Sequence, residues 1–232
     1  MTVGGGRRRS VLAAGLSVVV LLAACSSSSK PATKVQAPST CPAGPPVTPA
    51  GPPATLFAHA PIPAKVASET SPITVKGAHL VAFDGSGTDP SACATAPAVT
   101  GTAFSGRQVT IGTRGRPYLV MFVAHWCPHC RREVPLLAPW LRQGGVPKGI
   151  DVFLVATNTN ASYPNYPPSS WLRGVNWPTE VIGDSPAGAA ADAYGLTSFP
   201  YFVLVDAHGR VVSRFAGEVT TTALAQALHK LA

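Results

Sequence analysis

Apolar and polar residues follow two different periods in the middle of the chain. Residues 118–124 are a continuous apolar run, and residues 150–156 are apolar except for Asp151, which is the pattern of buried central strands. Between them, residues 127–142 carry apolar side chains at helical spacing, and the glycine pair at 144–145 ends that segment. The pattern therefore predicts a strand, a helix and a second strand in immediate succession.

Shorter apolar runs on either side extend this alternation. Residues 99–104 and 108–111 are separated by a Ser-Gly turn, and residues 201–205 and 210–215 by an Asp-Ala-His-Gly turn, so each pair predicts a hairpin. An amphipathic helix over 220–231 closes the chain. Strands that alternate with helices and end in an antiparallel pair predict an α/β fold with a central mixed sheet flanked by helices.

The N-terminus has the pattern of an export signal. Three arginines, Arg7–Arg9, precede an apolar run over 11–22 that is too short to span a bilayer, so we interpret residues 1–24 as a signal peptide. Its end, Leu-Ala-Ala-Cys, is similar to a lipoprotein box, with cleavage before Cys25 and acylation of that thiol. An ordinary cleavage site is the alternative. Arg8-Arg9 fits a twin-arginine signal, but the Sec route stays open.

The rest of the chain divides by composition. Residues 25–53 are rich in Pro, Ser and Ala and cannot bury enough surface to fold, so we expect a lipidated, semi-rigid tether several tens of Å long. Residues 54–95 are expected to form an N-terminal extension, with short strands at 73–75 and 79–83. Residues 96–232 form the predicted α/β domain.

Charge excludes one class of partner. The formal net charge is +8, and without the three signal arginines it is 8 − 3 = +5. The basic residues of the domain stand among glycines and form no stripe with aromatic residues, so no nucleic-acid binding is expected. A mildly basic surface instead suits anionic lipid headgroups.

The stretch Trp126-Cys127-Pro128-His129-Cys130 carries the candidate chemistry. It joins a predicted strand to a predicted helix, so Cys127 stands at a helix N-terminus, where the thiolate is stabilised. Cys130 follows about one helical turn later and can form a disulfide with Cys127. Half a zinc site is the alternative, but no second ligand pair with metal-binding spacing exists in the sequence.

The remaining cysteines have a different expected role. Of five cysteines, Cys25 is expected to carry lipid and Cys127 and Cys130 form the redox pair, which leaves Cys41 and Cys93. Outside the cytoplasm a structural Cys41–Cys93 disulfide can persist. Two free surface thiols are the alternative.

Residues 122–135 around the cysteine pair resemble the thioredoxin-like family, in particular its membrane-tethered TlpA/ResA branch. Residues 198–206 are similar to the segment that carries the cis-proline of that family. The resemblance extends from about Ala96 to the C-terminus. It implies a thioredoxin-like fold and a disulfide oxidoreductase that needs no cofactor and no metal.

The resemblance also implies roles for single residues. Cys127 is the nucleophile that forms a mixed disulfide, and Cys130 resolves it. His129 stabilises the thiolate, unless it is only a solvated loop histidine. Glu133 exchanges protons with the cysteine pair, unless it is a surface glutamate paired with Arg132 or another basic neighbour.

Three further residues are expected to contact substrate. Trp126 borders the site, and a cis Phe199–Pro200 bond turns the backbone of Phe199 towards Cys127, where a substrate peptide can pair with it. Two departures stand out. Met121 occupies the place of the buried aspartate of thioredoxin, which makes Glu133 the remaining proton carrier, and Phe199 is bulkier than the residues common at its position.

These observations predict a lipid-anchored thiol–disulfide oxidoreductase on the extracytoplasmic side of the cell membrane. Its partners would be thiols and disulfides of exported proteins and a membrane-embedded redox partner. The alternatives are a reductant for cytochrome c maturation, a peroxidase on the same fold, and a metal carrier using the two cysteines with His125 or His129. The dipeptide Pro128-His129 resembles the site of DsbA-type oxidants, so we expect a comparatively oxidising potential.

Overall fold

The computed structural model describes residues 1–5, 33, 35, 38–50, 61–112 and 114–231. The chain divides into two units, Met1–Pro31 and Ala32–Ala232, and the account below concerns the second. Most of the expected signal peptide, and the expected lipidation site Cys25, lie outside the described residues. Within the ranges just given, no helix combines the length and apolar character needed to cross a bilayer.

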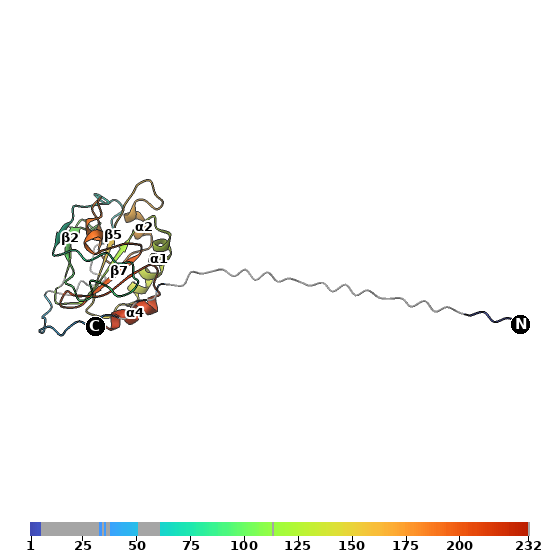
Figure 1. Cartoon of the computed structure of the whole chain (residues 1–232). Helices are drawn as coiled ribbons and strands as arrows, with labels where there is room; N and C mark the ends of the chain where they lie inside the picture. Colours follow the sequence, from blue (N-terminus) through green and yellow to red (C-terminus); the bar gives the residue numbers. More distant parts are fainter. Residues whose placement is uncertain (6–32, 34, 36–37, 51–60, 113, 232) are drawn as a thin grey trace. The chain divides into compact units, whose positions relative to one another are not determined.

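The main sheet has five strands in the order β6-β5-β4-β7-β8, of which Figure 1 labels β5 and β7. Strands β4, β5 and β6 are parallel, whereas β7 runs antiparallel to β4 and β8 antiparallel to β7. Apart from Asp151 at the start of β5, the central strands β4, β5 and β7 are apolar throughout, as expected of strands buried on both faces. The strands are β4 Tyr118–Val123, β5 Asp151–Ala156, β6 Val181–Gly183, β7 Tyr201–Val205 and β8 Val211–Ala216.

Helices cover both faces of this sheet. Alternate strand residues point to opposite faces, so Met121 packs in one apolar cluster and Phe122 in the other. The cluster around Met121 is shared with α1, α2 and α4, and the cluster around Phe122 with α3 and the smaller sheet. The predicted mixed α/β architecture is therefore confirmed. The helices are α1 Pro128–Arg142, α2 Pro168–Gly174, α3 Ala189–Ala193 and α4 Thr221–His229.

The smaller sheet contains three antiparallel strands, β1 Thr74–Lys76, β2 Ala98–Thr102 and β3 Gln108–Ile111. The predicted β2–β3 hairpin is confirmed, and β1 pairs with the other edge of β2, the edge away from β3. The predicted strand at 79–83 is wrong, because only an isolated bridge joins Phe83 to Leu196.

A buried ion pair explains the path of residues 79–91. The Arg214 guanidinium on β8 donates to both carboxylate oxygens of Asp89, with Nε 2.9 Å from Oδ2, and Nη1 donates to the Val81 carbonyl at 2.8 Å. Arg214 is 1% exposed. A buried guanidinium needs a hydrogen-bond partner for each of its donors. Residues 79–91 supply such partners to Arg214, so their backbone lies against the arginine and does not pair with a neighbouring strand.

Residues 38–50 differ from the expected free tether. The Ser39 amide donates to the Val212 carbonyl at 2.6 Å, Cys41 is bonded to Cys93 with an S–S distance of 2.10 Å, and Ala50 donates to the Arg114 carbonyl at 2.8 Å. The composition indicates that this segment cannot form a hydrophobic core of its own. Backbone hydrogen bonds and the Cys41–Cys93 disulfide nevertheless hold it against the domain.

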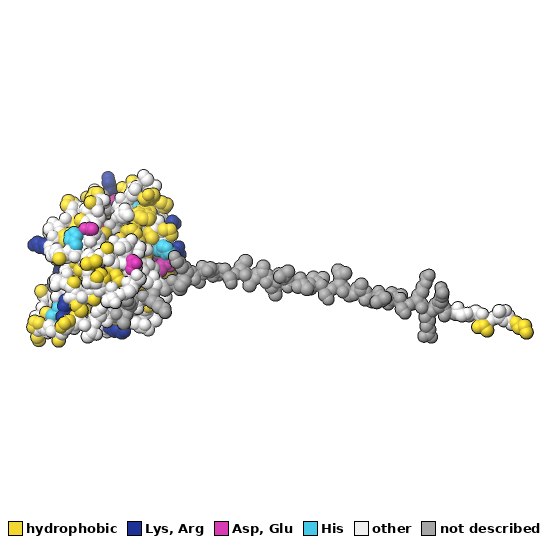
Figure 2. Space-filling model, viewed as in Figure 1, with side chains coloured by type: hydrophobic (Ala, Val, Ile, Leu, Met, Phe, Trp, Pro, Cys, Tyr) yellow, Lys and Arg dark blue, Asp and Glu magenta, His cyan; other side chains and the backbone are white. Residues whose placement is uncertain are grey.

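The charged surface agrees with the sequence. On the face that Figure 2 shows, Lys and Arg side chains are scattered singly among hydrophobic and uncharged groups and do not gather into a stripe.

Candidate active site

The two free cysteines lie where β4 passes into α1. Cys127 is the residue that caps α1, Pro128 is its first residue, and Cys130 lies one turn inside. Proline is suited to that first position because it needs no hydrogen-bond partner for a backbone N–H there. Cys127 is 5% exposed and Cys130 is fully buried. Both cysteines are buried, and of the two residues only Cys127 retains some exposed surface.

The surroundings push the two thiol pKa values apart. The pKa of Cys127 falls from 9.0 to about 6, chiefly through a hydrogen bond from the Cys130 thiol. Backbone N–H groups of Cys130 and His129 and the charge of His129 add to this effect, against the opposing influence of burial. The pKa of Cys130 is raised, first by burial and then by Cys127. One sulfur is therefore a thiolate at neutral pH and the other a thiol.

His129 points to a carboxylate that the sequence did not bring to attention. Its Nδ1 lies 2.6 Å from Oε1 of Glu218, and the Arg132 Nε donates to the same oxygen at 3.0 Å. These contacts lower the pKa of Glu218, with Arg132 as the larger cause. No local sequence pattern predicts this role of Glu218, because Glu218 lies 89 positions after His129 and comes next to it only in the folded chain.

Glu133 is buried, so the surface alternative does not hold. It is 3% exposed, and its Oε1 accepts from the Val219 amide at 2.7 Å. Its Oε2 has no hydrogen-bond partner among the described residues. Burial raises the pKa of Glu133 from 4.5 to about 8, although the Val219 hydrogen bond opposes the change. Its influence on the site is exerted on Cys130, whose pKa it helps to raise.

The expected substrate-contacting residues surround Cys127. The Phe199–Pro200 bond is cis, as predicted, and the Cys127 thiol lies 3.9 Å from the Phe199 carbonyl oxygen. The Trp126 ring meets the Phe199 ring edge-on, with 5.9 Å between centroids. The Trp126 indole N–H donates to the Asn158 carbonyl at 2.9 Å, which fixes the ring beside the thiol.

The loop after β5 completes this aromatic rim. Tyr163 packs against Trp126 with 5.5 Å between ring centroids, and half of Tyr163 is exposed. The sequence showed a long loop rich in Pro, Tyr and Asn here but gave no reason to place it at the site.

His125 holds that loop. Its Nε2 accepts from the Asn160 amide at 3.2 Å, so its Nδ1 carries the proton and donates to the Pro164 carbonyl at 2.8 Å. The ring is buried, and both nitrogens are engaged. His125 is therefore occupied as a structural residue and does not serve as the histidine of the carrier alternative, whereas His129, the other histidine considered, is paired with Glu218. Across the described ranges, no group of three or more Cys, His, Asp or Glu side chains is placed to bind a metal.

A groove with a volume of about 540 Å³ runs between α1 and the start of α4. Glu133 and Glu218 line one part of it, and Leu136 and Trp140 another. The groove therefore brings the buried Glu133 carboxyl close to the surface.

Comparison with known proteins agrees with this geometry. The sequence profile of the Redoxin family matches residues 92–231. The chain is 29% identical over 150 residues to the thiol:disulfide interchange protein CycY of Rhizobium leguminosarum bv. viciae, covering 64% of this chain and 72% of that protein. It is 27% identical over 121 residues to the methylamine utilization protein MauD of Methylobacillus flagellatus, covering 51% of this chain.

The chain spans about half the length of MauD, 54%. A thiol:disulfide interchange protein of the thioredoxin family from Chlorobium tepidum superposes with a TM-score of 0.49 at 20% identity, covering 59% of this chain and 94% of that one. The family match, the sheet order and the cysteine pair at the start of α1 lead to one conclusion. The chain belongs to the Redoxin family, with a thioredoxin-like fold and the dithiol site of a disulfide oxidoreductase.

Proposed function

We propose that this protein is a lipid-anchored thiol–disulfide oxidoreductase that exchanges disulfides with exported proteins outside the cytoplasm. The observation that carries the proposal is the difference between the two thiols, with a pKa of about 6 at Cys127 and a raised pKa at buried Cys130. A reactive thiolate at the surface and a protected thiol behind it are the two parts that disulfide exchange requires.

The exchange reaction runs in two steps. In the oxidising direction, a substrate thiolate attacks the Cys127 sulfur of the Cys127–Cys130 disulfide, which forms a mixed disulfide and releases Cys130. The second substrate thiolate then attacks its own half of that mixed disulfide, which releases Cys127 as a thiolate. Two electrons pass from the substrate to the protein, and the low pKa of Cys127 makes it the better leaving group.

Glu133 is proposed to serve Cys130. When Cys130 is released, its raised pKa demands a proton, and when it attacks it must lose one. The Glu133 carboxyl has a pKa of about 8, so it holds a proton at neutral pH and can give or accept one. The groove beside α1 provides exchange with solvent.

Substrate is proposed to bind along the rim formed by Trp126, Phe199 and Pro200. The Phe199 carbonyl lies beside the Cys127 sulfur, so an extended peptide that reaches the sulfur also reaches a backbone acceptor. The bulk of Phe199 and the exposed ring of Tyr163 favour substrates with apolar side chains next to the cysteine.

We propose that the protein works as an oxidant. A thiolate is present only in the reduced form, so a lowered pKa stabilises that form and raises the potential. At pH 7, a fall from 9.0 to about 6 stabilises the reduced form by about 1.4 kcal/mol, or roughly 30 mV for a two-electron couple. At this pH Glu133 is largely protonated, so it does not oppose the thiolate with a second negative charge.

The location and the domain organisation are part of the proposal. Residues 1–24 are proposed as the signal peptide, Cys25 as the lipid attachment site, and residues 96–232 as the redox domain behind an extension over 54–95. Support comes from the Arg7–Arg9 cluster followed by an apolar run and Leu-Ala-Ala-Cys. Partners would be thiols of exported proteins and a membrane-embedded protein that restores the disulfide.

The test is a refolding assay with a reduced, disulfide-containing protein, combined with the redox potential measured against glutathione. An oxidant forms substrate disulfides and has a potential well above that of thioredoxin. A potential near −270 mV, typical of thioredoxin, would instead favour the reductant for cytochrome c maturation.

A further inference from the structure

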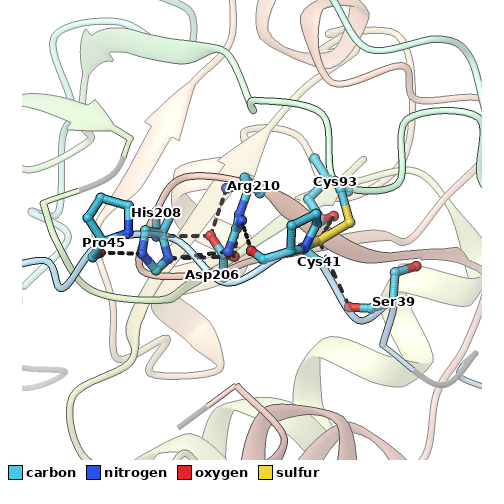
Figure 3. Close-up of polar contacts among 9 residues, drawn as sticks. Ser39, Cys41, Pro45, Cys93, Asp206, His208 and Arg210 are labelled. Atoms are coloured by element: carbon cyan, nitrogen blue, oxygen red, sulfur yellow. Dashed lines mark hydrogen bonds and ion pairs between the residues drawn. A yellow bond between two sulfur atoms is a disulfide. The ribbon is translucent and has the colours of Figure 1, made fainter.

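Residues 38–50, called the strap below, are fastened to the redox domain at several points (Figure 3). The Ser39 amide donates to the Val212 carbonyl of β8, and Cys41 is covalently joined to Cys93. Cys41 is half-buried and packs against the main apolar cluster. These contacts make the strap a part of the domain surface.

The turn between β7 and β8 holds the next part of the strap. The Arg210 guanidinium donates to the Pro42 carbonyl, and His208 Nε2 lies 2.9 Å from the Pro45 carbonyl. Asp206 fixes the arginine, because Arg210 Nε donates to its carboxylate at 2.8 Å. Figure 3 shows these three side chains of the turn beside the disulfide.

The fit is close at Gly44. A Cβ placed on Gly44 would come within 2.5 Å of the His208 ring, so only glycine allows the strap to approach this histidine. The contacts therefore depend on the backbone and the disulfide of the strap and on particular side chains of the domain.

The described contact nearest in sequence to Cys25 lies beside the active site. The Thr33 amide donates to the Glu218 carbonyl at 2.7 Å, and the Glu218 carboxylate is bonded to His129. His129 in turn stands between the two cysteines. Thr33, which makes the described contact nearest in sequence to Cys25, is thus linked through Glu218 and two hydrogen bonds to His129, the neighbour of Cys130.

These contacts limit the reach of the site. From Cys25 to Thr33 there are 33 − 25 = 8 residues, which span at most about 28 Å when fully extended. If the strap and the single Thr33 hydrogen bond were both released, the next described hydrogen bond between this segment and the domain would be that of Arg173 with the Pro63 carbonyl. The distance from Cys25 would then be 63 − 25 = 38 residues, or at most about 130 Å.

We infer that the strap, locked by Cys41–Cys93, confines the redox site to a layer close to the lipid headgroups and so selects its partners. The preferred partners are proteins whose cysteine thiols lie at the membrane surface. Proteins free in solution would react more slowly. This inference rests on the proposed oxidoreductase function and on lipid attachment at Cys25. Loss of the Cys41–Cys93 bond would release the strap, leave Thr33 held by a single hydrogen bond, and so widen the layer.

The experiment uses the full lipidated protein in vesicles, with Cys127–Cys130 oxidised. The probes are one dithiol peptide coupled to a lipid headgroup through a short linker, and the same peptide free in solution. Each peptide passes two electrons and two protons to the protein, which becomes the dithiol while the peptide becomes a disulfide. The measured quantities are the two rates of peptide oxidation.

The strap is released in the double variant Cys41→Ser/Cys93→Ser. The number of residues between Cys25 and the first contact with the domain grows 38/8-fold in this variant. Because the effective concentration of the redox site at the membrane falls as that tether lengthens, the rate with the lipid-coupled peptide should fall about fivefold to tenfold. The rate with the free peptide should stay within about twofold, since nothing in the double variant touches Cys127. The variant Gly44→Val, which keeps both cysteines, should shift the ratio of the two rates in the same direction.

The outcomes are separable. Equal rates for wild type and both variants with the lipid-coupled peptide, while the free peptide still reacts, would overturn the strap inference and leave the oxidoreductase function intact. No reaction of wild type with either peptide would remove the proposed function itself. Failure of wild type to float with vesicles, compared with the matched Cys25→Ala protein, would overturn the anchor and the strap inference together.

Discussion

The chain carries two cysteine pairs that differ in spacing, surroundings and state. Cys127 and Cys130 are three residues apart on one helix, both thiols are free, and their pKa values are pushed in opposite directions. Cys41 and Cys93 are 52 residues apart, belong to no helix or strand, and are joined by a disulfide.

The difference shows which features make a cysteine pair reactive. The first pair stands at a helix N-terminus, where backbone N–H groups and a neighbouring thiol stabilise one thiolate, so its disulfide opens readily. The second pair stands outside the helices and closes a long loop, so its formation removes conformational freedom from the unfolded chain. The sequence spacing of two cysteines, together with the local backbone conformation, therefore distinguishes a redox site from a structural cross-link.

The largest expected effect is on activity at the first pair. Cys127→Ser should reduce disulfide exchange to the uncatalysed background, because Cys130, the other free thiol among the described residues, is fully buried. Cys130→Ser, given a substrate that already carries a disulfide, should instead accumulate a mixed disulfide, because Cys127 attacks that disulfide and the resolving thiol is gone. Non-reducing gel electrophoresis and mass spectrometry detect that adduct. The Cys41→Ser/Cys93→Ser protein serves as the control and should keep its exchange activity with a soluble peptide.

The next effect is on stability at the second pair. Removing the Cys41–Cys93 bond, which closes a separation of 52 residues, should lower the free energy of unfolding by up to about 4 kcal/mol in the chain-entropy model. Urea unfolding of wild type and the double serine variant measures the loss. An unchanged midpoint would mean that the loop is already constrained in the unfolded chain, and the comparison between the two pairs would lose its thermodynamic basis.

A smaller effect sharpens the description of the redox site. The Glu133 pKa is raised from 4.5 to about 8, so the folded protein binds more protons than the unfolded chain between these pH values and its stability falls as pH rises. Glu133→Gln removes this dependence and should be more stable than wild type at pH 7 by up to about 3 kcal/mol. Melting temperatures of both proteins at pH 5 and pH 8 provide the measurement. Parallel pH profiles would show that the carboxyl ionises normally.

The smallest effect concerns the thiolate itself. Alkylation of Cys127 by iodoacetamide should show a midpoint near pH 6, and Cys130 should not react in that range. His129→Thr should raise the Cys127 pKa and make the protein more reducing. The shift should be less than one pKa unit, or less than roughly 30 mV, because hydrogen bonds from Cys130 and the backbone contribute more than the histidine charge.

His129→Gln is the matched variant for this measurement, since it keeps a hydrogen-bonding side chain without the charge. A shift of two units or more in either variant would assign the low pKa mainly to His129. No shift at all would show that the pairing with Glu218 fully compensates its charge.

Much of the site could be anticipated because its parts are close together in the sequence. The apolar run at 118–124 and the helical spacing after Cys127 are local patterns, and they placed the cysteine pair at the strand–helix junction that the structure shows. The cis bond at Pro200 was predicted only through family resemblance, since nothing local requires it. The strand expected at 79–83 failed because one buried arginine, distant in the chain, decided the path of the backbone.

By itself, the sequence determined the fold class, the dithiol motif and its helix N-terminus, because residue periods of two and 3.6 and the geometry of one helical turn are local properties. Only the tertiary structure decided that Glu133 is buried, that Glu218 faces His129 and that residues 38–50 are fastened to β8. Each of these depends on groups between 86 and 173 positions apart, derived from 219 − 133 = 86 and 212 − 39 = 173. The pKa of a side chain and the reach of a tether are set by whatever the folded chain brings next to them, and no local pattern contains that information.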